Sequence, residues 1–116
     1  MAIVRHEAGE QSEVLVCHVT CPNEEEASKI AEALVTGDLS ACVNIIPGIK
    51  SVYKWKGKVE TDQEVLCIIK TTRTCFPRMA AKVKELHKYD VPEIIATEVT
   101  AANKDYFDWV IQTVVN

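Results

Sequence analysis

Several features that would assign the chain to a special class are missing from its 116 residues. No apolar run approaches the ~20 residues that a membrane-spanning helix needs, and there is no internal repeat, linker or low-complexity segment. A basic surface is also missing: the net charge is −4, which argues against nucleic acid or an anionic membrane as partner. With 47% apolar and 26% charged residues, the composition is typical of one soluble globular domain.

Motifs of cysteine chemistry and of catalysis are missing too. The five cysteines are an odd number, no two have CxxC spacing, and three lie in apolar strand patterns. This usage predicts reduced, structural thiols in a cytoplasmic protein rather than a disulfide framework. No Ser-His-Asp ordering, glycine-rich phosphate loop or HExxH occurs, so no enzyme activity is predicted. The first twelve residues lack the apolar core of a secretory signal, and we expect a disordered lead over 1–12.

What the sequence does contain is a regular order of strands and helices. Residues 13–20 are apolar on both faces and predict a central strand that is covered on both sides. Asn23, with Glu26 three residues later, fits a helix N-cap, and the apolar stripe that follows ends at Gly37.

Two strands, a helix, a strand and a last helix complete the chain. The second strand is predicted over 41–55, the third pairs with it and ends at residue 72, and the fourth covers 94–99. Thr74 and Asn103 are the expected N-caps of the two helices. The order β-α-β-β-α-β, followed by one helix, predicts a single α+β domain over 13–116 with a ferredoxin-like fold. Its four-stranded antiparallel sheet would carry two helices on one face.

The hairpin made by the second and third strands is too long for a compact monomer. A strand over 41–55 spans about 50 Å, whereas a domain of this size has a radius of gyration of about 13 Å. Pro47-Gly48 predicts a bulge and Lys56-Gly57 the two-residue turn. The turn pairs Trp55 with Lys58, Tyr53 with Glu60, and Val52 with Thr61.

The projecting ribbon would leave apolar side chains and two strand edges uncovered. Ile49, Tyr53 and Trp55 share one face of it, and an isolated two-stranded ribbon is marginally stable. We therefore expect a homo-oligomer in which these three residues lie at the interface. The alternative is a hairpin that folds back over its own chain.

Four segments carry a family resemblance: "TCPNEEEASKIAEALV", "LSACVNIIPGIKSVYKWKGKVE", "EVLCIIKTT" and "YDVPEIIATEV". From about Val14 to Val110 the chain resembles the CutA, or divalent-cation tolerance, family. The resemblance implies a ferredoxin-like monomer assembled through its long hairpins into a homotrimer, similar in architecture to the PII signalling proteins. It also implies a role in tolerance of copper and other divalent metals, without an established catalytic reaction. Animal members of the family are associated with acetylcholinesterase processing at membranes.

Metal binding is the first functional hypothesis. The copper site attributed to bacterial relatives uses a cysteine and a histidine pair, and the matching positions here are Val19 and Leu86-His87. Only His87 remains of that site, with Cys21 nearby as a second donor. One imidazole does not make a soft-metal site, so the alternative is that His87 caps its helix. His18 is expected to be a hydrogen-bonded sheet residue.

Ligand binding in clefts between subunits is the second hypothesis. Lys70 and Arg73 could present positive charge beside the second helix, and the resemblance places further candidates near the clefts: Tyr89, Glu93, Tyr106 and Trp109. The alternative is that these residues serve packing and ion pairs. Fold alone does not assign function. The loop of acylphosphatases, the ATP loop of PII proteins and the strand aromatics of RNA-recognition domains are all missing.

The sequence therefore predicts a non-catalytic, cytoplasmic homotrimer of divalent metal (copper) tolerance that binds Cu²⁺ or another divalent cation weakly and requires no cofactor. We expect no nucleic-acid partner and no membrane insertion. The competing prediction is a trimeric scaffold or small-ligand sensor that binds a metabolite, an anion or a partner protein.

Overall fold

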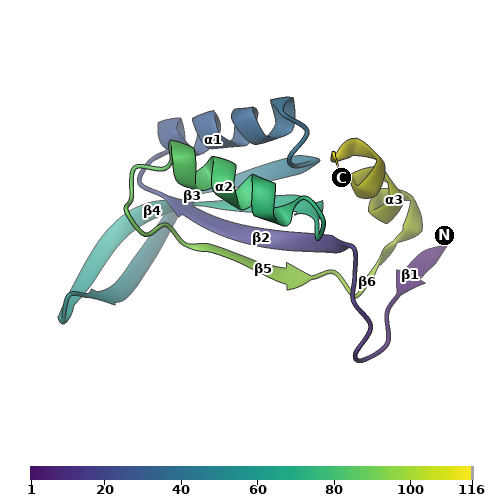
Figure 1. Cartoon of the computed structure of the whole chain (residues 1–116). Helices are drawn as coiled ribbons and strands as arrows, with labels where there is room; N and C mark the ends of the chain where they lie inside the picture. Colours follow the sequence, from purple (N-terminus) through teal and green to yellow (C-terminus); the bar gives the residue numbers. More distant parts are fainter. Residues whose placement is uncertain (116) are drawn as a thin grey trace.

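The computed structural model describes residues 1–115. Three helices and six strands follow one another along the chain: β1 (Ile3–Arg5), β2 (Val14–Cys21), α1 (Glu24–Thr36), β3 (Cys42–Trp55), β4 (Lys58–Thr72), α2 (Phe76–Leu86), β5 (Ile94–Glu98), β6 (Ala101–Asn103) and α3 (Lys104–Thr113). The main sheet is antiparallel in the order β3-β4-β2-β5, and α1 and α2 lie together on one of its faces (Figure 1). This is the predicted ferredoxin-like arrangement.

The strand β2 is central, as predicted, but only one of its faces is fully covered. Leu15, Cys17, Val19 and Cys21 point toward the helices and are buried in the main core with Ile30, Leu34 and Met79. Val16 and His18, on the other face, are half-buried. The prediction of full cover on both sides is wrong for the single chain because α3 packs at one end of the sheet instead of across its second face (Figure 1).

The helix ends follow local chemistry in two of three cases. The Asn23 side chain accepts a hydrogen bond from the Glu26 amide at 2.9 Å, Gly37 ends α1, and Asn103 caps α3 by accepting from the Asp105 amide. The prediction for Thr74 is wrong. Cys75 occupies the N-cap of α2 without a side-chain hydrogen bond, since Pro77 fixes the first turn one residue later.

The hairpin of β3 and β4 has the predicted register. Trp55 pairs with Lys58, Tyr53 with Glu60, and Val52 with Thr61, and the register shifts between Ile46 and Ile49, where Pro47-Gly48 forms the bulge. Lys56 and Gly57 have φ of 49° and 79°, the left-handed conformation that a tight two-residue turn requires. The hairpin projects from the body of the molecule (Figure 1), whose longest dimension is 46 Å.

The N-terminal segment departs from the prediction of a disordered lead. Ile3–Arg5 forms β1 and pairs with Ala101–Asn103 in a separate two-stranded sheet, and the His6 amide donates to the Thr100 carbonyl at 2.7 Å. Val4 packs against a second core that contains Phe107 and Val110 of α3. The segment is ordered because α3 and β6 supply both an apolar surface and free backbone groups.

The face of the main sheet opposite α1 and α2 carries no helix over most of its area (Figure 1). One row of cross-strand neighbours there is Asn44, Ile68, His18 and Ile95, and the next contains Ile46, Leu66 and Thr20. We call these seven residues the open face. Ile95 is 56% exposed and Ile46 is 41% exposed in the single chain.

Candidate functional site

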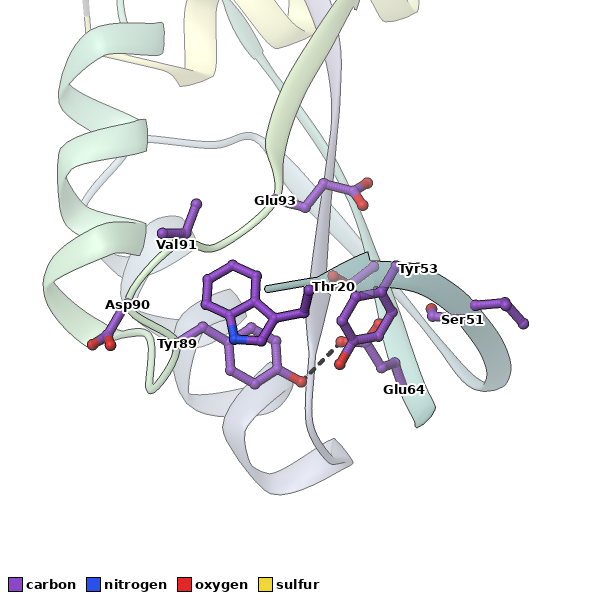
Figure 2. Close-up of a pocket in the computed structure, with 10 residues that line it drawn as sticks. Thr20, Ser51, Tyr53, Glu64, Tyr89, Asp90, Val91 and Glu93 are labelled. Carbon is purple, nitrogen blue, oxygen red and sulfur yellow. Dashed lines mark hydrogen bonds between the residues drawn. The ribbon is translucent and has the colours of Figure 1, made fainter. Parts of the chain in front are cut away.

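A pocket of about 600 Å³ lies between the projecting part of the hairpin, which contributes residues from Ser51 to Trp55, and the loop between α2 and β5 (Figure 2). This volume is in the range of small-molecule sites. Three aromatic residues, three acids and four smaller residues line it: Tyr53, Trp55, Tyr89; Glu64, Asp90, Glu93; Thr20, Ser51, Val52 and Val91. Of the predicted cleft and interface residues, the pocket unites Tyr89 and Glu93 with Tyr53 and Trp55.

Glu64 is the deepest acid of the pocket. Glu64 is only 8% exposed, and Tyr89 Oη donates to its Oε2 at 2.8 Å (Figure 2). Burial, this hydrogen bond and the charge of Glu64 together raise the pKa of the Tyr89 phenol above its usual value. The tyrosine therefore stays a hydrogen-bond donor at neutral pH.

A second tyrosine–carboxylate pair lies beside the first. The Tyr53 hydroxyl donates to Asp62, and this hydrogen bond is the main reason why the pKa of Tyr53 rises to about 12. The negative charges of Asp62, Glu60 and Glu64 act in the same direction. The pocket wall is thus aromatic and negatively charged.

His87 lies behind the pocket residues Thr20 and Tyr89, and both of its ring nitrogens are hydrogen-bonded. Its Nε2 donates to the Thr20 carbonyl at 2.7 Å, and its Nδ1 accepts from the Tyr89 amide at 3.1 Å. The imidazole also lies against the Tyr89 ring, with 4.6 Å between centroids. His87 follows α2 as its C-cap and ties that helix to the end of β2. A metal ion would have to break both hydrogen bonds to reach this side chain.

Cys21, the second predicted metal donor, lies inside the main core. It is 0% exposed, and it faces the helices, on the side of the sheet away from His18. A hydrogen bond with Cys67, together with burial, raises the pKa of the Cys21 thiol far above its usual value. Metal ligation requires the thiolate, so this environment opposes it.

The remaining cleft candidates lie apart from the pocket. Lys70 follows Glu64 by six residues on β4, about 20 Å along the strand, and its Nζ is held by Asn44 and by Cys42 at 3.9 Å. Arg73 donates to the Ser12 carbonyl at 3.0 Å and pairs with Glu98. The predicted anion site is not assembled, because the basic groups are already engaged.

Tyr106 and Trp109 sit on α3 with ring centroids 5.4 Å apart. Burial, followed by contact with Cys42, raises the pKa of Tyr106. Both residues are about two-fifths exposed and lie near the Cys42 end of the sheet. They therefore belong to a different surface of the molecule than the pocket residues.

Sequence reasoning did not single out Glu64, Asp62 or Asp90. The one available signal was the position of Glu64 directly before the apolar run Val65–Ile69, where an acid is unusual. Among residues 1–115, no three His, Cys, Asp or Glu side chains are grouped so that they could hold a metal ion.

The fold and the pocket define a ferredoxin-like α+β protein with a projecting hairpin. Residues 15–113 match the family model of the CutA1 divalent ion tolerance protein, and the chain belongs to this family. It is 50% identical over 91 residues to the divalent-cation tolerance protein CutA of Thermus thermophilus, a match that covers 78% of this chain and 88% of the relative. It is 48% identical over 99 residues to the human protein CutA, covering 85% of this chain and 55% of the longer relative.

Solved structures agree with this assignment. The structure of the divalent cation tolerance protein from Thermus thermophilus superposes with a TM-score of 0.87 at 46% identity and covers 88% of this chain and 99% of that one. The structure of CutA1 from Oryza sativa also gives 0.87, at 42% identity, and covers 91% and 97%. The chain spans about half the length of several curated eukaryotic relatives, including the chloroplastic CutA of Arabidopsis thaliana at 52%.

Proposed function

We propose that the chain acts as a non-catalytic homotrimer in divalent-cation tolerance and binds divalent cations weakly. The observation that carries this proposal is the open face combined with the unpaired edge of β3, in a chain of the divalent ion tolerance family. A single copy leaves this apolar sheet surface and the fourteen-residue edge strand uncovered.

The hairpin supports assembly through its exposed apolar residues. Val52, Val59 and Trp55 are 64%, 70% and 45% exposed. Side chains of this kind on a long free strand promote pairing with another chain, and closed symmetry limits that pairing to a defined number of copies. Three copies follow the architecture that the family resemblance implies, with Ile49, Tyr53 and Trp55 at the contact.

Weak metal binding is supported by the donor chemistry. Carboxylates are in excess, with 17 acids against 13 basic residues, but the described residues offer no preformed group of three donors. His87 contributes to copper binding only if its contacts with Thr20 and Tyr89 break. Cys21 contributes only after the core opens.

The cytoplasm is the proposed location. All five cysteines are free thiols, which suits a reducing compartment. None of the helices in residues 1–115 is long and apolar enough to cross a membrane.

Two measurements test the proposal. Sedimentation equilibrium should give a mass of three chains, and a monomer at all concentrations would overturn the assembly. Calorimetric titration of Cu²⁺ and Zn²⁺ should give weak binding to the wild type and the same binding to His87→Ala. A large loss in the variant would instead restore His87 as a ligand, while no binding to either protein would remove metal from the function.

The second candidate function is a trimeric scaffold or small-ligand sensor, and one observation favours it. The pocket of Tyr53, Glu64 and Tyr89 has the volume of a ligand site and already exists in one chain. The acidic residues in its lining disfavour an organic anion in this pocket, whereas the anion site predicted at Lys70 and Arg73 is a different place in the fold.

A further inference from the structure

The N-terminal strand β1 is held on the rest of the chain by few contacts. It pairs with β6 over three residues, with Ile3 opposite Asn103 and Arg5 opposite Ala101. Val4 packs against the second core, whereas Ile3 is 64% exposed. A two-stranded ribbon by itself is marginally stable in water. The position of β1 therefore depends on a short backbone ladder and one apolar side chain.

His6, directly after β1, shows that the docked segment fits its place imperfectly. Its amide donates to the Thr100 carbonyl at 2.7 Å, and its ring lies against Phe107 with 5.9 Å between centroids. Within residues 1–115, Nδ1 of this ring is the one buried side-chain nitrogen or oxygen without a hydrogen-bond partner. A buried polar atom without a partner opposes its own burial. The docked state thus carries a penalty that release into water removes.

The loop after His6 joins β1 to the body of the chain at a point further along. Its own hydrogen bonds are local, since the Glu10 amide donates to the Glu7 carbonyl at 3.1 Å and the Glu7 amide to the Glu10 carboxylate at 2.7 Å. The chain is fixed again at Ser12, whose amide donates to Glu98 Oε1 at 2.9 Å and whose carbonyl accepts from Arg73 Nε at 3.0 Å. The six residues between these two points reach up to about 20 Å when extended.

This segment lies outside the part of the chain that carries the family fold. Residues 15–113 match the family model, which therefore begins after β1 and its loop. In Figure 1, β1, β6 and α3 lie at the end of the molecule away from the projecting hairpin. β1 thus binds to the surface of the ferredoxin-like body in the way a ligand would, at a place that the hairpin does not reach in its own chain.

We propose that the edge of β6 and the adjoining surface of α3 form a strand-docking site at which residues 3–5 of a second copy replace the chain's own β1. An exchanged strand makes the same backbone pairs and the same Val4 contact, so exchange between copies loses no contact. The reach of the loop and the local concentration of copies then decide the outcome. Linked or assembled chains present such a segment at about millimolar effective concentration. The inference goes beyond the proposed role in metal tolerance and requires no metal.

Two single-cysteine variants test the exchange directly. Arg5 and Ala101 are cross-strand partners and both are exposed. Arg5→Cys in one chain therefore meets Ala101→Cys in another only when β1 crosses between copies. The two variants are co-expressed so that they assemble together, and both carry Cys42→Ser, because the other four native cysteines are buried.

Oxidation with diamide should give a disulfide-linked band of two chains on a non-reducing gel. The band should form about tenfold faster or more than in a control pair of Arg5→Cys with Val35→Cys, because docking raises the effective concentration of the two thiols. Val35 is 43% exposed but lies on α1, where no strand docks. Adding Val4→Asp to the Arg5→Cys chain should abolish the band, since a carboxylate does not replace valine at the second core.

The double variant Arg5→Cys/Ala101→Cys is the reference for geometry and should close its disulfide within one chain at high dilution. If it closes while the mixed chains give no more product than the Val35→Cys control, β1 stays on its own chain and the inference is wrong. A two-chain band that survives Val4→Asp would show collision of a loose tail rather than docking. A double variant that never closes would contradict the register of the site. Sedimentation of the reduced samples reports the assembly separately, so failure of the exchange is distinguishable from failure of the proposed homotrimer.

Discussion

The substitution Ile95→Lys separates assembly from folding. Ile95 lies on the edge strand β5, opposite His18, and 56% of it is exposed in the single chain. A lysine is tolerated there if the chain stands alone, because its ammonium group reaches water. Covering the open face with another copy would bury this position, and the substitution then acts at the contact.

The expected loss of association free energy follows from the exposed fraction of Ile95. Full burial of an isoleucine side chain stabilises by about 1.5–3 kcal/mol, so burying the remaining exposed half contributes about 1–1.5 kcal/mol per chain. A trimer of the variant loses this contribution at each of its three chains. Each buried, unpaired ammonium costs several kcal/mol more, and the sum is comparable to the whole stability of many domains.

Sedimentation velocity over a range of concentrations is the assay. Ile95→Lys should dissociate to monomers at concentrations where the wild type remains assembled, with an unchanged far-ultraviolet circular dichroism spectrum. Val35→Lys on α1 is the matched control, since Val35 is 43% exposed but lies on the helical side. If Ile95→Lys keeps the mass and melting temperature of the wild type, the open face is not the contact.

Three further predictions concern the single chain. His87→Ala should lower the free energy of unfolding by about 1–3 kcal/mol, measured by urea titration, because the Thr20 carbonyl and the Tyr89 amide lose their partner; an unchanged midpoint would show that this link is not stabilising. Asn23→Ala should lower the free energy of unfolding by about 1 kcal/mol through loss of the α1 cap, whereas Asn103→Ala should disturb only the first turn of α3. Burial raises the pKa of Cys17 from 9.0 to about 12. Its stabilising contribution is therefore complete below pH 9 and is lost as the pH rises toward 12; in Cys17→Val, urea midpoints should fall less over this range than in the wild type, and equal falls would contradict the assignment.

Local sequence was sufficient for most of the fold. The N-caps at Asn23 and Asn103 depend on neighbours within three residues. The register of the hairpin follows from a two-residue turn at Lys56-Gly57 and the twofold alternation of strands. Interactions of this short range are readable from the order of residues.

The errors lie where distant segments meet. Ile3–Arg5 has no strand pattern of its own and is ordered by Ala101–Asn103, almost a hundred residues away. Full cover of β2 was expected from its composition, but α3 packs at one end of the sheet, so this composition is explained only if another surface covers the open face. Thr74 does not cap α2 because its hydroxyl donates to the distant Glu13 carboxylate at 2.7 Å and the helix begins one residue later.

The candidate site shows the same division more sharply. Tyr53, Trp55, Tyr89 and Glu93 were singled out from the sequence, yet nothing in it showed that Lys70 and Arg73 would be engaged elsewhere by Asn44 and Glu98. The sequence by itself determined the four strands of the main sheet, the three helices, the hairpin register and the family, because these follow from local propensity and from similarity along the chain. Only the tertiary structure decided that Glu64 is buried beside three aromatic rings and makes no ion pair within residues 1–115, since burial and charge pairing depend on which distant residues come together.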